Sequence, residues 1–121
     1  MLGVIVFAHG SRDPLWRAPV ESVARQIAQA DPAASVQCAY LELCEPDIAT
    51  AADRLVAAGA RQVRVLPLFF GMGKHAREDL PLLLQTLRTT HPQVRFEQLT
   101  TAGEEPRLTA LLARIALESK P

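Results

Sequence analysis

The stretch Leu2-Gly3-Val4-Ile5-Val6-Phe7-Ala8 is apolar throughout and is followed at once by the polar turn sequence His9-Gly10-Ser11-Arg12-Asp13-Pro14. A short apolar run bounded by turn residues is typical of a central strand in a parallel sheet, which is covered on both faces. In open α/β sheets, ligands bind outside the carboxyl ends of the strands. We therefore expect His9, the first polar side chain after this strand, to lie at the functional site.

Strand-like and helix-like segments alternate along the rest of the chain. The expected strands are residues 2–8, 35–42, 62–69 and 93–99, and the expected helices are residues 15–29, a segment from about Pro46 to a cap at Gly59, residues 78–89 and residues 105–118. This order predicts a parallel sheet with helices on both of its faces.

The composition of the strands predicts their order in the sheet. Segments 2–8 and 62–69 are mostly apolar, whereas 93–99 alternates between apolar and charged residues and 35–42 includes Gln37. Alternation fits an edge position better than a central one. We therefore expect an α/β, flavodoxin-like domain with a four-stranded parallel sheet in the order 2-1-3-4.

The composition also limits the class of protein. With 121 residues, of which 49% are hydrophobic, the chain is expected to form a single domain over residues 1–121. A formal net charge of zero gives no support for nucleic-acid binding. No apolar stretch is long enough to span a membrane, and no secretion signal is apparent before the first strand. We expect a cytoplasmic protein that binds neither nucleic acid nor membranes.

The two cysteines, Cys38 and Cys44, have a spacing that matches no zinc or redox motif. We interpret both as free thiols. A redox-sensitive or metal-contacting Cys44 is the alternative, and neither interpretation implies secretion.

Three residues that can bind a metal or transfer a proton follow three successive strands. They are His9 after the first strand, Glu42 at the end of the second and His75 in the loop after the third. In the order 2-1-3 these strands are neighbours about 4.8 Å apart, so the three side chains can converge on one ion. Two imidazoles and a carboxylate with open positions suit Co²⁺, Fe²⁺, Ni²⁺ or Zn²⁺.

Each of the three residues also has a simpler interpretation. His9 can cap a turn, Glu42 can be a solvated acid at a strand end, and His75 can be an ordinary loop residue. Their joint placement favours a metal site over these alternatives. His91 is far from the strand ends and is interpreted as a surface residue, and Asp47 as an acid that the helix dipole favours at the start of a helix.

Basic residues lie on the same loops as the candidate site, namely Arg12, Arg17, Lys74 and Arg77. Parallel crossovers also direct helix N-termini toward this edge of the sheet, and both features favour anions. The pattern predicts a small polyanionic ligand. Ordinary surface charge is the alternative, and we prefer it for Arg17.

Three segments carry longer sequence patterns: His9–Pro14, Tyr40–Ile48 and Leu66–Pro81, the last of which contains Gly71-Met72-Gly73-Lys74-His75 and then Asp79-Leu80-Pro81. Together, in this order, they resemble the CbiX/SirB sirohydrochlorin chelatases over nearly the whole chain. The third segment is the most specific. Its Gly71-Met72-Gly73-Lys74 wording departs from the commonest family pattern.

The resemblance implies a chelatase-type fold and a lyase that inserts a divalent metal into sirohydrochlorin without ATP. Co²⁺ is expected first, then Fe²⁺, with Ni²⁺ also possible, for cobalamin or siroheme biosynthesis. No cofactor is expected beyond this substrate metal ion. His9, Glu42 and His75 map onto the catalytic and metal-binding residues. Ser11, Arg12, Lys74 and Arg77 are expected to bind the substrate, which has eight carboxylates.

The resemblance further implies a homodimer, because short family members have one domain where longer relatives have two similar ones. Two other functions remain as hypotheses. One is a non-catalytic carrier of a tetrapyrrole or a metal on the same fold. The other is phosphoryl transfer through His9, as in histidine phosphatases, but those enzymes have an arginine at the position that Ala8 occupies here.

Overall fold

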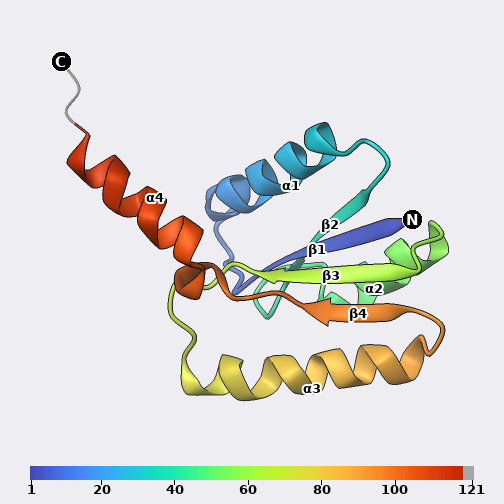
Figure 1. The fold of residues 1–121 in the computed structure, drawn as a ribbon. Helices are drawn as coiled ribbons and strands as arrows, with labels where there is room; N and C mark the ends of the chain where they lie inside the picture. Colours follow the sequence, from blue (N-terminus) through green and yellow to red (C-terminus); the bar gives the residue numbers. More distant parts are fainter. Residues whose placement is uncertain (119–121) are drawn as a thin grey trace.

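The four strands form one parallel sheet in the order β2-β1-β3-β4, which confirms the predicted order (Figure 1). The computed structural model describes residues 1–118, so residues 119–121 of the expected domain lie outside the described part. Val6 pairs with Cys38 on one side and with Leu66 on the other, and the three strands therefore end at the same edge of the sheet. The strands are β1 (Leu2–Ala8), β2 (Ser35–Tyr40), β3 (Gln62–Pro67) and β4 (Arg95–Gln98).

Helices lie on both faces of this sheet (Figure 1). The helix α1 packs against β1 and β2 on one face, while α2 and α3 cover the other. No helix within residues 1–118 is long and apolar enough to cross a membrane. The α-helices are α1 (Ala18–Ala30), α2 (Ile48–Ala57), α3 (Lys74–Thr90) and α4 (Pro106–Leu117), and the 3-10 helices are η1 (Pro14–Arg17) and η2 (Ala102–Glu104).

The strand β1 is buried on both faces because successive side chains point to opposite sides of the sheet. Ile5 and Phe7 belong to the core under α2 and α3, whereas Val4 and Val6 belong to the core under α1. Complete burial of one such side chain contributes about 1.5–3 kcal/mol. This double burial explains why the strand contains no polar residue before His9.

The strands β2 and β3 end two residues earlier than expected, at Tyr40 and Pro67. Proline has no N–H to donate to the ladder, so β3 stops at this residue. Beyond β2 the chain turns away at Leu43, which has a φ of 69°. Glu42 therefore lies in the loop after β2 and not at the end of the strand. The strand β4, expected over residues 93–99, is also shorter at both ends.

The helix α3 begins at Lys74, four residues before the expected start at residue 78. Gly73 is its N-cap residue, and good helix formers such as lysine, alanine and arginine follow immediately. His75 therefore lies in the first turn of a helix and not in a loop. The earlier start changes which residues share a face with His75.

The other helix boundaries differ less. The expected helix at 15–29 begins as the 3-10 turn η1, and its α-helical part ends at Ala30. Pro46 lies before α2 rather than in its first turn, because Asp47 is the N-cap residue. Gly59 follows the end of α2 with a φ of 104°, the left-handed conformation expected of a helix-ending glycine.

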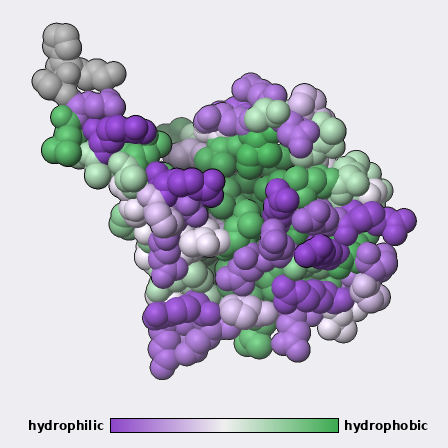
Figure 2. All heavy atoms as spheres, viewed as in Figure 1, coloured by the Kyte–Doolittle hydropathy of each residue, from purple (hydrophilic) through white to green (hydrophobic). Residues whose placement is uncertain are grey.

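The helix α4 matches the expected segment but does not cover the sheet. It extends away from the strands (Figure 1), and none of its described residues is buried. Leu111, Leu112 and Ile115 are exposed, and together with Leu108 they follow helical spacing. Figure 2 shows hydrophobic residues gathered over the sheet between α1 and α4. Within residues 1–118, no residue of the apolar stripe of α4 is buried.

We expect Asp47→Ala to lower the free energy of unfolding by about 1 kcal/mol, since an N-cap acceptor is lost. The Oδ1 atom of Asp47 accepts a hydrogen bond from the Thr50 N–H at 2.8 Å. This backbone bond, and then the bond from the Thr50 side chain, lower the pKa of Asp47. The stabilisation is thus present above the ordinary Asp pKa and is lost as pH falls through the lowered value.

Urea unfolding of parent and variant at neutral and acidic pH measures this effect. The difference between them should shrink in acid. Asp47→Asn keeps a capping oxygen and should remain close to the parent at neutral pH. Equal destabilisation by Asn and Ala would show that capping is not the cause.

Candidate functional site

The loops after β1 and β2 are joined by two main-chain hydrogen bonds beyond the strand ends. The Leu41 N–H donates to the Ala8 carbonyl at 2.9 Å, and the Glu42 N–H donates to the His9 carbonyl at 3.0 Å. These bonds hold His9 and Glu42 side by side. The His9 Nε2 atom lies 3.4 Å from Glu42 Oε1, and the two side chains are 51% and 56% exposed. The pair is therefore open to solvent at the carboxyl edge of the sheet.

The His9 ring makes only a weak contact with its own turn. Its Nδ1 atom lies 3.5 Å from the Gly10 carbonyl, which is long for a hydrogen bond. The closer ring contact is the carboxylate of Glu42. Both ring contacts are long, so neither fixes the orientation of the imidazole.

Gly10 is the residue that permits the close approach of the two loops. It has a φ of 104°, which side-chain-bearing residues rarely adopt. A Cβ atom at this position would lie 1.8 Å from the Glu42 carbonyl oxygen. Any larger residue would push the backbone of Glu42 away from His9. The sequence contains this glycine in its first motif, but the requirement for it arises from a contact with a segment more than thirty residues away.

His75 lines the same cavity as His9 and Glu42. The cavity has a volume of about 700 Å³, within the range of about 300–1,000 Å³ that ligand pockets occupy. All three candidate residues predicted from the sequence therefore face one space, although His75 reaches it from a helix. The lining residues are His9, Leu41, Glu42, Phe69, Gly71, Gly73, Lys74, His75, Ala76 and Asp79.

The three candidate residues do not form a ready-made ligand cluster. Within residues 1–118, no three side chains of His, Cys, Asp or Glu are grouped so that they could hold a metal ion together. His9 and Glu42 are a close pair, and His75 shares the cavity without joining them. An imidazole beside a carboxylate offers two ligands that suit borderline divalent ions and leaves coordination positions open.

Asp79 is a cavity residue that the sequence analysis missed as a site candidate. It lies four residues after His75 in α3, and both residues line the cavity. Residues four apart share one face of a helix. The spacing is visible in the sequence, but it has meaning only if the helix begins before His75. Because the expected helix began at residue 78, the two residues were placed in different elements.

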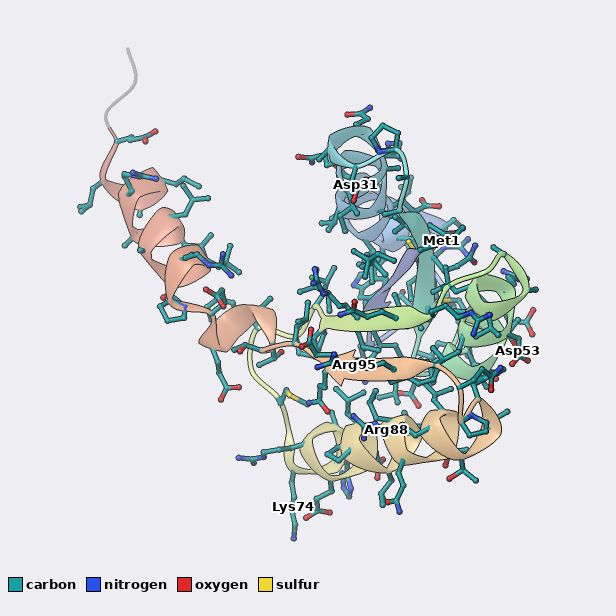
Figure 3. The ribbon with its side chains drawn as sticks, turned by 45° about the vertical axis from the view of Figure 1, so that its right-hand side comes forward. Met1, Asp31, Asp53, Lys74, Arg88 and Arg95 are labelled. Atoms are coloured by element: carbon teal, nitrogen blue, oxygen red, sulfur yellow. The ribbon has the colours of Figure 1, made fainter. Side chains whose placement is uncertain are left out.

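The predicted substrate-binding residues are only partly gathered at the cavity. Lys74 begins α3 and is among the residues that line the cavity, and its side chain extends outward from the molecule (Figure 3). The Ser11 hydroxyl accepts a hydrogen bond from the Asp13 N–H at 3.0 Å, so it also shapes its own turn. Arg12 and Arg77 are exposed and do not line the cavity. A role for these two arginines in substrate binding stays a prediction.

Two sets of residues lie outside the cavity. His91 lies away from the cavity, as expected, but it is partly buried: its side chain is 14% exposed, and its Nε2 lies 2.9 Å from Asp53 Oδ1. Asp53 is at the end of the molecule opposite Lys74 (Figure 3).

Cys38 and Cys44 are free and half-buried, as expected. Burial raises the pKa of the Cys38 thiol, and burial raises the pKa of neighbouring Tyr40 to about 12.

The sequence matches the CbiX family model over residues 3–119. A sirohydrochlorin cobaltochelatase of Sulfolobus acidocaldarius is 35% identical over 112 residues, which are 93% of this chain and 87% of that protein. A sirohydrochlorin cobaltochelatase of Methanopyrus kandleri is 32% identical over 69% of this chain, and the match spans only 59% of that relative's length.

Solved structures share the fold. A protein from Marinobacter aquaeolei described as a cobalamin biosynthesis CbiX protein has a TM-score of 0.81 and 31% identity, and the match covers 96% of this chain and 94% of that one. The sirohydrochlorin chelatase SirB from Bacillus subtilis, in complex with cobalt, has a TM-score of 0.78 and 23% identity. That match covers 95% of this chain but 50% of SirB.

We expect Gly10→Ala to separate His9 from Glu42 and to lower the free energy of unfolding by about 2 kcal/mol or more, because it adds both a steric clash and an unfavourable φ. Gly71→Ala is the matched control. It lines the same cavity, but an added Cβ there has no atom within 4 Å. Chemical denaturation measures the stability of both variants, and the NMR signals of the His9 ring report its surroundings. Equal stability of the two variants would contradict this role of Gly10.

Proposed function

This chain belongs to the CbiX family, and we propose that it is a sirohydrochlorin chelatase. It inserts a divalent metal into sirohydrochlorin without ATP, with Co²⁺ as the principal ion and Fe²⁺ next. The observation that carries the proposal is the exposed His9–Glu42 pair, 3.4 Å apart, on a cavity of about 700 Å³ that His75 also lines. The cobaltochelatase names of its relatives support the substrate and the metal.

His9 and Glu42 are the first ligands of the incoming metal ion. Both side chains are exposed, so a hydrated ion reaches them without any displacement of the core. The carboxylate supplies charge, and the imidazole supplies a ligand that borderline divalent ions prefer. His75 lines the same cavity and supplies the third protein ligand when the macrocycle and the ion are both bound.

Insertion of the ion replaces two pyrrole N–H protons with two metal–nitrogen bonds. As the ion moves from the protein to the macrocycle, the imidazoles of His9 and His75 lose their bonds to it. Each freed imidazole accepts one pyrrole proton, which is possible near neutral pH because the ordinary pKa of histidine lies close to it. The two protons then pass to water. The two histidines thus first bind the metal ion and then accept the two pyrrole protons.

The cationic residues at the cavity bind the carboxylates of the substrate. Lys74 lines the cavity, and Arg12 and Arg77 lie on the elements that border it. Ser11 adds a hydroxyl donor in the turn after His9. Because the whole chain carries no net charge, attraction of a polyacid depends on these local charges.

An anaerobic absorbance assay of sirohydrochlorin with Co²⁺, Fe²⁺ and Ni²⁺ tests the proposal. We expect insertion above the spontaneous rate, fastest with Co²⁺. His9→Ala, Glu42→Ala and His75→Ala should each lower the rate on the order of 10²-fold, the range of a lost general base or ligand. His91→Gln is the control, because His91 pairs with Asp53 away from the cavity.

The assay also separates the alternatives. If His9→Ala and His75→Ala insert metal as fast as His91→Gln does, the assignment of the site is wrong. If the protein binds sirohydrochlorin but leaves the insertion rate at its spontaneous value, a carrier function replaces the enzymatic one.

We propose in addition that the protein is a homodimer in which α4 of each copy packs on the other. Leu111, Leu112 and Ile115 form an exposed apolar stripe. A hollow of about 290 Å³ at the base of α4 includes Leu66, Leu99 and Leu108, on the sheet face where α1 packs mainly on β1 and β2. Within residues 1–118, one chain thus carries both a helix with no buried residue and an apolar surface, and a two-fold arrangement brings them together.

The size of SirB supports the same arrangement. This chain matches half of that protein, so two copies together have about the length of one SirB chain. The helix α4 has 12 residues and spans about 18 Å. A stable complex of standard size buries about 1,200–2,000 Å² in total, so the two reciprocal helix contacts and the sheet surface beside them must together supply this area.

We expect a dimer in sedimentation velocity at micromolar concentration, and we expect Ile115→Asp to convert it to a monomer, because a buried unpaired carboxylate is costly. Ala110→Asp is the matched control, since it adds the same charge to the opposite side of α4. A monomeric parent protein would exclude the dimer. Dissociation by both variants would place the interface elsewhere.

A further inference from the structure

The loop of residues 68–73 connects the end of β3 to the start of α3, and we call it the cavity loop. It supplies Phe69, Gly71 and Gly73 to the cavity wall. His75 follows two residues after it, in the first turn of α3. The position of this loop therefore determines where His75 lies relative to His9 and Glu42.

The side chains of Leu68, Phe69 and Met72 pack the cavity loop against the cores on the two faces of the sheet. Its first residue, Leu68, donates its N–H to the Phe7 carbonyl at 2.7 Å. Gly73 provides no side-chain cap for α3. A Cβ added at Gly71 or Gly73 would have no atom within 4 Å, so no neighbouring group packs closely on these two residues.

The carbonyl of Phe69 attaches the backbone of the loop to the segment after β4. It accepts a hydrogen bond from the Gly103 N–H at 3.0 Å and one from the Thr101 hydroxyl at 2.9 Å. A carbonyl oxygen has two lone pairs, and both are used here. The Thr101 hydroxyl also lies 3.3 Å from the Pro67 carbonyl. Both donors come from one turn, residues 101–104, which passes beside the cavity loop (Figure 1).

Thr101 carries a buried hydroxyl, with 4% of the surface of the residue exposed. A buried hydroxyl is stable only when it is hydrogen-bonded, and here its acceptors are carbonyls at the end of β3 and in the cavity loop. Its burial is thus tied to the position of that loop.

Gly103 lies directly against the backbone of the cavity loop. A Cβ at this position would be 1.3 Å from the Phe70 carbonyl oxygen and 2.2 Å from its carbon. The backbone of Gly103 does not have a positive φ, so glycine is needed here for space and not for conformation. Any side chain would displace the loop.

We propose that Thr101 and Gly103 are positioning residues for the metal-handling site. They hold the carbonyl of Phe69, and through it the start of α3, so that His75 faces the His9–Glu42 pair across the cavity. The consequence for catalysis rests on the proposed function, whereas the effect on the loop does not. Neither residue lines the cavity, so they act only through the loop.

Thr101→Val tests the proposal because it removes the hydroxyl and keeps the shape. Thr101→Ser restores the hydroxyl, and Thr100→Val is the matched control at an exposed neighbour. Two quantities are measured on the full chain: amide hydrogen exchange of residues 68–76, and kcat and KM for Co²⁺ insertion into sirohydrochlorin. Circular dichroism checks that each variant is folded, and Thr101→Ala replaces Thr101→Val if the latter is not.

We expect Thr101→Val to speed exchange in the cavity loop about tenfold and to lower kcat on the order of tenfold or more, since small misplacements of catalytic groups are costly. Thr101→Ser and Thr100→Val should stay within about twofold of the parent in both quantities. Gly103→Ala should resemble Thr101→Val.

The proposal is overturned if exchange of residues 68–76 is unchanged in Thr101→Val, or if Thr101→Ser fails to restore it. It is also overturned if exchange rises but kcat stays at the parent value. If the parent inserts no metal, the proposed function fails, and the exchange data alone then decide whether Thr101 holds the loop.

Discussion

Burial of β1 on both faces is the constraint on which the rest of the structure depends. Ile5 and Phe7 fill the core beneath α2 and α3, and Val4 and Val6 fill the core beneath α1. The strand pairs in parallel with β2 and β3, so the carboxyl ends of all three meet at one edge. A polar residue is excluded from this strand until it leaves the sheet. His9 is therefore the first residue after this strand whose side chain can bind a ligand or transfer a proton.

The geometry of the site arises from backbone contacts just beyond the strand ends. Two main-chain hydrogen bonds extend the pairing of β1 and β2 into their loops and place His9 beside Glu42. Gly10 allows this because it leaves room for the Glu42 carbonyl. His75 reaches the same cavity from α3 without completing a three-residue cluster within residues 1–118. An open pair with a separate third group suits a metal that must be released, because a closed ligand set would hold it.

The segment after β4 contacts the cavity loop and then continues into the exposed helix α4. Its turn at residues 101–104 holds the cavity loop through the Phe69 carbonyl. Two residues later α4 begins and extends away from the sheet with its apolar stripe exposed. In the proposed dimer, the start of α4, the helix that packs on the other copy, thus lies next to the loop that leads to His75.

The sequence by itself determined the parallel sheet, its order, and the placement of His9, Glu42 and His75 near one edge, because apolar strands and turn residues are local signals. The family resemblance also rested on local motifs, and the match over residues 3–119 confirmed it. Only the tertiary structure decided that α3 starts at Lys74, which brings Asp79 to the cavity, and that α4 leaves the sheet uncovered. The same is true of Gly10 against Glu42 and of Gly103 against Phe70. These contacts join segments about thirty residues apart, and the need for glycine at each exists only once the two backbones have met.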